Sequence, residues 1–332
     1  QLGEAVEGKR QELIRRLNMA PNGTPFLVSM REDLIKFLPI NTELKNLDED
    51  IRHLFKSWFN PGFLRLEKIT WETKAAILEK IIKYEKVHQI KDMNDLKRRL
   101  QQDDRRFFAY FHPILKDEPL IFVEVAFTKG IGKSIQQLIK PKTDENLNYD
   151  TATFYSINNC QDGLMRVTLG NFLIKRVVFE IQQENQKIKN FGTLSPLPGF
   201  ADWFFSLNNT KLQDILKKYD ISKLEFLKSP QLKVGNPKIV EEEEALKKLV
   251  CHYLINEKIN NKPLNPVSRF HLGNGASIHD VIINGNTSDY GYSESFGIMV
   301  NYGYQLDKLE HIHEDFITKG KISYSDKIKK YV

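Results

Sequence analysis

The stretch LMRVTLGNFLIKRVV at residues 164–178 decides the fold that this sequence predicts. Its second half opens a series of apolar residues with helical spacing, Phe172, Leu173, Val177, Val178 and Ile181. That spacing is typical of an amphipathic helix with one buried face. The first half follows a predicted strand at 151–157 and carries Gly170 near the junction. The stretch therefore predicts a strand joined to a helix by a glycine-containing turn.

A turn of this kind can bind an anion, because free backbone N–H groups converge where a helix begins. We predict a phosphate-binding loop formed by Met165, Arg166, Val167, Thr168, Leu169, Gly170 and Asn171. Lys175 and Arg176 lie in the next turn and would add positive potential. The alternative is an ordinary strand-to-helix turn, and these residues alone leave both interpretations open.

Strands and helices are mixed on both sides of this stretch. Strands are expected at 63–70, 107–112, 120–127, 188–194, 278–283 and 297–302, and helices at 75–84, 92–100, 212–219 and 240–254. The strand at 120–127 is almost continuously apolar, which predicts burial of both its faces. After residue 254 the chain is expected to end in short strands.

The first sixty residues differ, because only helical patterns occur there. One helix is expected at 24–38, with Thr24 as its N-cap and Pro25 at its first position, and a second at 47–58 carries an apolar stripe. The sequence NPG at 60–62 then breaks the chain. We predict an α+β protein with a helical domain at 1–60 and a mixed-sheet domain at 61–332. The apolar stripes of the short helices need a partner, in the rest of the chain or in a second subunit.

Composition limits the classes of ligand and partner that this chain is expected to bind. It has 332 residues, of which 41% are hydrophobic, and a formal net charge of +6. A distributed positive excess suits a ligand with several phosphates. Nucleic acid is not expected, since no helix carries a continuous basic stripe. A membrane is not expected either, since no window approaches the roughly 18 consecutive apolar residues of a spanning helix.

The cysteines and the chain ends bear on the compartment. Cys160 and Cys251 are far apart and belong to no CxxC pattern, which predicts inert thiols in a reducing compartment. The chain begins at Gln1 rather than at methionine, so we expect a trimmed N-terminus that can already have lost a targeting peptide. It ends in KKYV, without the SKL signal of peroxisomal proteins. We expect a cytoplasmic or mitochondrial location.

Two side chains and the end of one predicted strand are candidates for catalysis. Ser195 follows a strand and precedes two prolines and a glycine that stiffen the backbone, although it could simply cap the next helix. His271 precedes a GNG turn and has an ordinary pKa suited to proton transfer, although a lone histidine is often structural. The last predicted strand, at 297–302, places Asn301 and tyrosine hydroxyls near its end. The pair His311 and His313 has no cysteine or carboxylate set beside it, so we predict no metal site.

Together these stretches resemble the malonyl-CoA decarboxylase family. The resemblance rests on FLIKRVV at 172–178, LSPLPGF at 194–200, LNP at 264–266, FHLGNGA at 270–276 and MVNYGY at 299–304, with weaker support from FLRLEKITW at 63–71 and DMNDLKRR at 92–99. The motifs occur in the family's order and span most of the chain.

The resemblance implies a helical N-terminal domain and a catalytic domain with the acyltransferase fold of the GNAT superfamily. The loop at 165–171 would bind the pyrophosphate of CoA, with Thr168 where animal relatives have glutamate. Ser195 would match the catalytic serine and His271 the catalytic histidine, while Tyr304 would line the same site. The resemblance also implies a homotetramer and a longer helical region, so we expect that the beginning of that region is missing here.

The implied reaction converts malonyl-CoA to acetyl-CoA and CO2, and it needs no metal and no cofactor beyond the CoA of the substrate. Two other functions remain as alternatives. One is a GNAT-type acyltransferase that passes an acyl group to an amine, and the other is a non-catalytic acyl-CoA sensor. A pure binder would need neither Ser195 nor His271.

Overall fold

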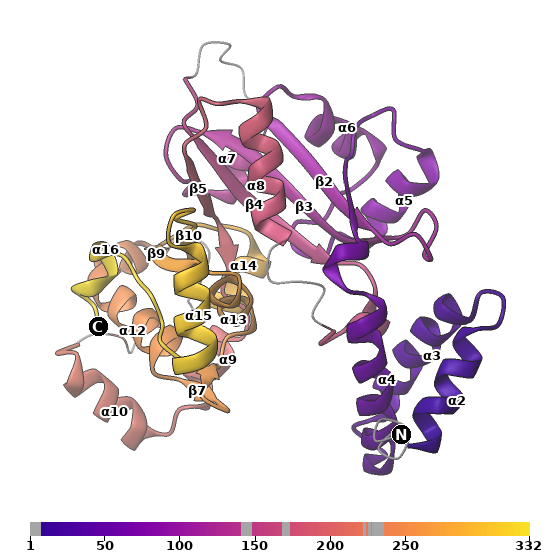
Figure 1. Ribbon diagram of the computed structural model, residues 1–332. Coiled ribbons are helices and arrows are strands. Elements are labelled where there is room, and N and C mark those ends of the chain that lie inside the picture. Colours follow the sequence, from indigo (N-terminus) through magenta and orange to yellow (C-terminus); the bar gives the residue numbers. More distant parts are fainter. Residues whose placement is uncertain (1–7, 141–147, 168–172, 222–223, 225–226, 228–235) are drawn as a thin grey trace. The chain divides into compact units, whose positions relative to one another are not determined.

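The structure is a computed structural model that describes residues 8–140, 148–167, 173–221, 224, 227 and 236–332 (Figure 1). Its internal contacts divide the chain into two compact units. Unit 1 consists of Gln1–Glu124 and Ser156–Val177, and unit 2 of Val125–Tyr155 and Val178–Val332. Two strands, β3 (Pro119–Thr128) and β4 (Thr151–Asn159), pass from one unit to the other.

Unit 1 begins with helices α2 (Lys9–Asn18), α3 (Gly23–Phe37) and α4 (Lys45–Trp58), with a short 3-10 turn, η1 (Thr42–Leu44), before α4. The two specifically predicted helices are therefore confirmed. In α4 the expected stripe is buried through Ile51, Leu54 and Phe55. In Figure 1, α2, α3 and α4 form a bundle of their own within unit 1.

The predicted start of α3 is wrong. The N-cap is Asn22, in the left-handed conformation at φ 57°, and Thr24 lies inside the first turn. The Thr24 hydroxyl donates to Asn18 Oδ1 at 2.6 Å instead of capping the helix. The tight connection between α2 and α3 explains the shift, because a Cβ at Gly23 would lie 2.3 Å from the Leu17 carbonyl oxygen. Glycine is required there, and it sets the first position of the helix.

The rest of unit 1 is a piece of sheet with two helices. After the 3-10 turn η2 (Pro61–Phe63), β1 (Arg65–Lys68) pairs antiparallel with β2 (Arg105–Phe111). Helices α5 (Ala75–Tyr84) and α6 (Met93–Gln101) pack on these strands through a core that includes Ile81, Leu96, Phe107 and Phe122. All ten residues of β3 are buried, so its predicted burial on both faces is confirmed.

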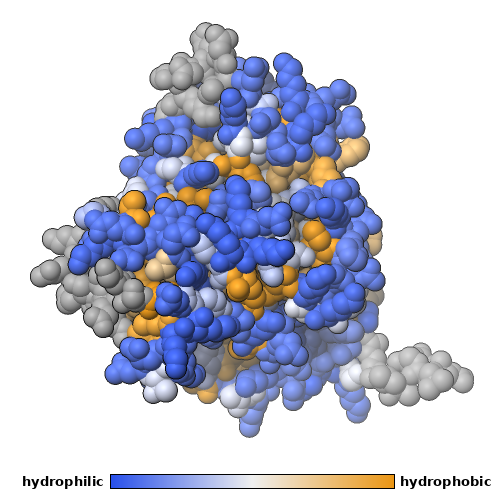
Figure 2. Space-filling model, turned by 90° about the vertical axis from the view of Figure 1, so that its left-hand side faces the viewer, coloured by the Kyte–Doolittle hydropathy of each residue, from blue (hydrophilic) through white to orange (hydrophobic). Residues whose placement is uncertain are grey.

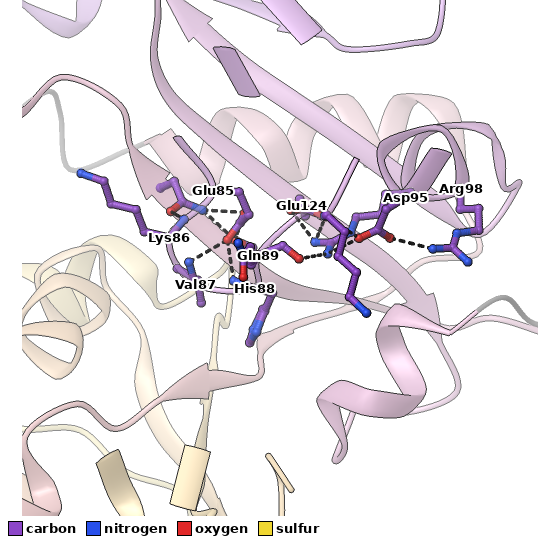
Figure 3. Close-up of polar contacts among 12 residues, drawn as sticks. Glu85, Lys86, Val87, His88, Gln89, Asp95, Arg98 and Glu124 are labelled. Atoms are coloured by element: carbon purple, nitrogen blue, oxygen red, sulfur yellow. Dashed lines mark hydrogen bonds and ion pairs between the residues drawn. The ribbon is translucent and has the colours of Figure 1, made fainter. Parts of the chain in front are cut away.

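Two buried carboxylates stiffen unit 1 (Figure 3). Glu85 accepts hydrogen bonds from the Val87 and His88 amides at 2.7 and 2.6 Å and from the side chains of Ser156 and Asn158 at 2.7 and 2.8 Å. Glu124 is fully buried and pairs with Arg99 at 3.3 Å. A buried charge is tolerated only when it is paired or hydrogen-bonded, so these contacts are required for the fold.

Arg99 joins a further carboxylate to this pair, Asp95 at 3.5 Å. Its Nη2 also donates to the Gln89 carbonyl at 3.0 Å. The α6 helix is thereby tied both to the loop before it and to the buried end of β3 in unit 1.

Unit 2 contains a mixed sheet. Strand β5 (Asn190–Thr193) runs parallel to β4, while β10 (Met299–Gly303) pairs antiparallel with β5, β6 (Ser195–Pro196) and β9 (Ser277–Ile282). The predicted strand at 188–194 is thus two short strands on either side of Leu194. The sheet and helices together confirm the α+β class. The boundary at residue 60 stays a prediction.

Helices make up most of the remainder. The helix α8 (Leu173–Glu184), which starts in unit 1, confirms the amphipathic pattern that follows the predicted loop. The others are α7 (Ile135–Ile139), α9 (Phe200–Ser206), α10 (Asn209–Lys218), α11 (Pro237–Glu241), α12 (Glu243–Ile255), α13 (Pro266–Gly273), α14 (Asp289–Ser295), α15 (Leu309–Lys319) and α16 (Asp326–Lys329), with a small hairpin of β7 (Lys258–Ile259) and β8 (Lys262–Pro263). The short strands expected at 278–283 and 297–302 are confirmed as β9 and β10, but the chain does not end in strands alone, since α13 to α16 accompany them.

The surface is mainly hydrophilic on the face in Figure 2, where hydrophobic residues form separate patches. Within the N-terminal helices and their connections several large apolar side chains are exposed: Leu13, Leu17, Met19, Phe26, Phe37 and Ile40. Among the described residues, no helix combines the length and the apolar character needed to cross a membrane.

Candidate active site

Ser195 lies at the start of β6, where the strand pairs with β10 through Val300. Its hydroxyl donates to Thr193 Oγ1 at 2.9 Å, and Ser195 Oγ is also 2.9 Å from His271 Nε2. The alternative that Ser195 caps the next helix is wrong, because the N-cap of α9 is Gly199. The serine oxygen therefore lies between Thr193 and the histidine rather than at a helix end.

The strand end that carries Ser195 is fixed by side chains in place of a regular ladder. Thr193 Oγ1 accepts from the Tyr302 amide at 3.1 Å, and the Thr193 carbonyl accepts from Asn301 Nδ2 at 2.7 Å. The Leu194 amide donates to the Phe154 carbonyl at 2.9 Å and so extends the parallel pairing with β4. These hydrogen bonds satisfy backbone groups on both sides of Leu194 and fix the position of the Ser195 hydroxyl.

His271 is held by α13, a helix that the sequence analysis did not predict. Asn265 caps it, accepting from the Ser268 amide at 2.9 Å, and Pro266 occupies its first position. Asn265 Nδ2 also donates to the Pro198 carbonyl at 2.9 Å. One fully buried asparagine therefore ties the helix of His271 to the loop that follows Ser195.

The GNG turn after His271 has a steric cause. Gly275 has φ +82°, and a Cβ there would lie 2.4 Å from the Leu309 carbonyl oxygen. Asn274 ends the helix, and its side chain donates to the Phe270 carbonyl at 2.8 Å. The turn lets α15 approach the C-terminal end of α13 closely.

The three catalytic candidates form one hydrogen-bonded chain. His271 Nδ1 is 2.8 Å from the Tyr304 hydroxyl, and Nε2 is 2.9 Å from Ser195 Oγ. The Tyr302 ring stacks on the imidazole, with 4.5 Å between ring centroids. Ser195, His271 and Tyr304 are all buried. The structure thus brings together side chains separated by more than a hundred residues in the sequence.

Burial determines the charge state of this chain. It lowers the pKa of His271 to about 3 and raises the pKa values of Tyr302 and Tyr304 above their usual range. The imidazole is therefore neutral at pH 7 and carries one N–H. Because the one Ser195 proton is donated to Thr193, Nε2 carries the imidazole proton and donates to Ser195 Oγ, while the Tyr304 hydroxyl donates to Nδ1. The chain can pass a proton along its length without leaving a charge on the histidine.

Comparison with known proteins identifies the family. Residues 62–332 match the family model of the malonyl-CoA decarboxylase C-terminal domain, and residues 1–59 match that of the N-terminal domain. The chain belongs to the malonyl-CoA decarboxylase family. The family predicted from the motifs, and with it the enzyme class, is confirmed.

Relatives of this decarboxylase family are similar over nearly the whole chain. The mitochondrial malonyl-CoA decarboxylase of Anser anser anser is 34% identical, over 96% of this chain and 68% of that protein, and the Mus musculus enzyme is 31% identical, over 98% and 71%. The crystal structure of malonyl-CoA decarboxylase from Rhodopseudomonas palustris has a TM-score of 0.86 and 42% identity, covering 99% of this chain and 81% of that chain. That from Agrobacterium vitis has a TM-score of 0.85, with the same identity and coverage.

The predicted phosphate loop lies only partly within the described residues. Met165 and Arg166 are exposed, Val167 is buried, and Thr168, Leu169, Gly170 and Asn171 fall outside the described part. Lys175 and Arg176 are both exposed on α8. Arg176, however, donates to the Leu64 carbonyl at 2.9 Å and lies over the Tyr110 ring, so it is engaged in packing α8. The role of the loop stays a prediction.

The histidines and cysteines noted in the sequence form no metal site among the described residues. Within the described ranges, no three His, Cys, Asp or Glu side chains gather as a metal site. His313 Nδ1 lies 2.8 Å from the Gly273 carbonyl, and His311 lies near Asp315. Cys160 and Cys251 are free and buried, and burial raises the pKa of both thiols, that of Cys251 to about 12. Thiols with such pKa values are poor nucleophiles at pH 7.

Several residues of the site escaped the sequence analysis. Thr193 and Tyr302 contact Ser195 and His271 directly, yet neither was singled out from the sequence. Asn265 was noted only as part of a motif, although an asparagine before a proline is a recognised signal for the start of a helix. That signal would have predicted α13. Nothing in the local sequence indicates that the Thr193 side chain replaces a ladder hydrogen bond.

Proposed function

We propose that this protein decarboxylates malonyl-CoA to acetyl-CoA and CO2. The observation that carries the proposal is the buried chain Ser195–His271–Tyr304 in a member of this family. It offers an oriented hydroxyl and a proton relay, the two things that the reaction asks of the protein.

The thioester itself accepts the electrons. When the C–C bond to the carboxylate breaks, the electron pair delocalises into the thioester carbonyl as an enolate, and CO2 leaves. The protein has to hold the carboxylate out of the enolate plane and remove it from water, since the charged form is favoured by hydration. It also has to deliver a proton to the carbon that becomes the methyl group.

We assign these tasks to the three side chains. Ser195 hydrogen-bonds the departing carboxylate, His271 delivers the proton, and Tyr304 orients the imidazole through Nδ1. The overall reaction consumes one proton, which the relay recovers from solvent after CO2 has left. No metal and no added cofactor takes part in this scheme.

The low pKa of His271 fits this role once the substrate charge is considered. In the free protein burial keeps the imidazole neutral. A malonyl carboxylate placed beside Ser195 would raise the histidine pKa, because an opposite charge stabilises the protonated form. When the carboxylate leaves as neutral CO2, that stabilisation disappears and the pKa falls again. The proton is then transferred at the moment when the enolate needs it.

The loop at 165–171 is proposed to bind the pyrophosphate of CoA. In support, the described part of α8 begins at Leu173, close after these residues in the sequence, and a helix start favours phosphate. Residues 61–332 are proposed to form the GNAT-like catalytic domain and residues 1–60 a helical domain. A cytoplasmic or mitochondrial location is proposed as well.

The helical domain is further proposed to mediate homo-oligomerisation, with a tetramer as the implied state. Its predicted apolar stripes are buried within unit 1, but Leu13, Met19, Phe26 and Ile40 remain exposed. Exposed apolar side chains gathered in one region favour association. Light scattering at micromolar concentration tests this, and a monomer would contradict it.

The function itself is tested with malonyl-CoA as the sole substrate. Acetyl-CoA and CO2 should form in equal amounts without an acyl acceptor. An acyltransferase would instead need an amine and would release free CoA. Absence of acetyl-CoA formation by folded protein would refute the proposed function.

A further inference from the structure

Unit 1 contains a cavity of about 410 Å³ between helices α3 and α4 and the segment that follows β4. Its size lies within the usual range of small-molecule pockets, roughly 300–1,000 Å³. Residues 165 and 166, at the start of the predicted pyrophosphate loop, form part of its wall. The cavity is therefore bordered by the N-terminal helices on one side and by the beginning of that loop on the other.

Positive charge predominates in this cavity. Four cationic side chains line it, Arg31, Lys45, Arg52 and Arg166, against two carboxylates, Asp48 and Glu49. Arg31 is buried and pairs with Asp48 at 2.8 Å. Among the described residues, Lys45, Arg52 and Arg166 have no hydrogen-bond or ion-pair partner. Like charges that converge on a cavity repel one another, so an anionic ligand would relieve the repulsion.

The other part of the wall is apolar. Ile35, Leu38, Pro39 and Met165 line it, and Met165 is about half exposed. A flat apolar ring can bury its faces against such side chains while its charged substituents reach the cations. The cavity therefore combines the two surfaces that an adenine nucleotide requires.

The cavity wall is held rigidly. Arg31 Nη1 donates to the carbonyls of Gly163 and Met165 at 2.6 and 2.9 Å, which fixes the chain just before Arg166. A Cβ at Gly163 would lie 2.0 Å from the Val28 carbonyl oxygen, so α3 can approach this segment only because residue 163 is glycine. A preformed wall of this kind reduces the ordering cost of binding.

We propose that this cavity binds the 3′-phosphorylated adenosine end of CoA, with the apolar wall against adenine and Lys45 and Arg52 on the 3′-phosphate. The inference rests on the proposed function, because it assigns a part of the substrate. It gives the N-terminal helices a direct role in substrate binding besides assembly.

Binding of CoA is compared with binding of 3′-dephospho-CoA by calorimetry on the full chain. The wild type should bind CoA roughly tenfold more tightly, the lower end for a hydrogen bond to a charged group at a partly exposed site. Arg52→Gln should reduce this ratio towards one, and Lys45→Gln should reduce it in part. Lys56→Gln is the matched control, because it removes one positive charge four residues further along α4 at a residue that does not line the cavity. The control should keep the wild-type ratio.

A third probe, 3′-phosphoadenosine 5′-phosphate, distinguishes the substrate end from a separate regulatory nucleotide. Competition with CoA supports the proposal, whereas binding that leaves CoA affinity unchanged overturns it. Equal affinity of the wild type for CoA and dephospho-CoA, or an unchanged ratio in Arg52→Gln, also overturns it. Decarboxylation is measured separately. If acetyl-CoA forms but CoA and dephospho-CoA bind with equal affinity, only the proposed role of the cavity is refuted. If CoA binds more tightly as expected but no acetyl-CoA forms, only the proposed function is refuted.

Discussion

Replacement of His271 by asparagine tests the proposed proton donor most directly. The imidazole makes two hydrogen bonds, at 2.9 Å to Ser195 and 2.8 Å to Tyr304, and stacks on Tyr302. Asparagine is shorter and can keep at most one of these bonds, and it cannot relay a proton between two ring nitrogens. We expect kcat to fall by about 10²–10⁴, the usual contribution of a general acid–base group.

Ser195→Ala and Tyr304→Phe should have smaller effects. Ser195→Ala removes one hydrogen bond to a charged group, worth about 1.5–3 kcal/mol, so kcat should fall by roughly ten- to 150-fold. Tyr304→Phe leaves Nδ1 without its buried partner, which costs about 1–3 kcal/mol in stability or in orientation. If the three side chains act as a unit, a His271→Asn/Ser195→Ala double variant should be little worse than His271→Asn alone.

The assay combines three measurements on each variant: kcat for acetyl-CoA formation, CoA affinity and melting temperature. A catalytic role predicts a low kcat with CoA affinity retained. A purely structural role predicts a lower melting temperature with nearly normal turnover per folded molecule. Near-normal kcat in His271→Asn would show that another group supplies the proton.

Three further predictions concern pH, stability and positioning. Because the pKa of His271 is about 3 in the folded protein and about 6.5 unfolded, its contribution to stability is complete above pH 6.5 and is lost as the pH falls towards 3. Between pH 7.5 and pH 5, denaturant melts should show the wild type losing about 2 kcal/mol more than His271→Asn; an equal loss would contradict the neutral, buried imidazole. Arg99→Met should lower the free energy of unfolding by about 3–5 kcal/mol, since it leaves Glu124 buried and unpaired, while exposed Arg98→Met should cost less than about 1 kcal/mol; similar chemical-denaturation midpoints for the two would refute this. Asn265→Ala should lower kcat and leave CoA affinity unchanged, because it loosens α13 and not the CoA site; a kinetic assay that finds the affinity altered and kcat preserved would speak against a positioning role.

Helices and strands were predictable where their apolar residues follow a regular pattern along the sequence. The helix at 75–84 has the bounds that the apolar spacing predicts, and β3 is buried on both faces as its apolar run requires. Long periodic segments are read reliably because many residues contribute to the same signal. The three catalytic candidates were found for a different reason, since strand ends and glycine turns restrict where a polar side chain can be fixed.

What could not be predicted depends on contacts between separate helices and strands. The start of α3 shifts because Gly23 approaches the Leu17 carbonyl, a close contact that no local pattern records. The strand at 188–194 divides because the Tyr302 amide of β10 donates to the Thr193 side chain, which interrupts the pairing with β10 between Gly192 and Ser195. In both cases contacts between elements decide the local geometry. Prediction from the intrinsic propensities of the residues is therefore limited at these positions.

The residues that position the site share a property that explains why they were overlooked. Thr193 and Asn265 are short, neutral and buried, and each bonds to a backbone group of another segment. A search for acid–base or nucleophilic side chains passes over them, because their chemistry is limited to hydrogen bonding. Yet a donor displaced by about 1 Å can cost two orders of magnitude in rate. The alignment of Ser195 with His271 therefore rests on these backbone contacts at least as much as on the two catalytic candidates themselves.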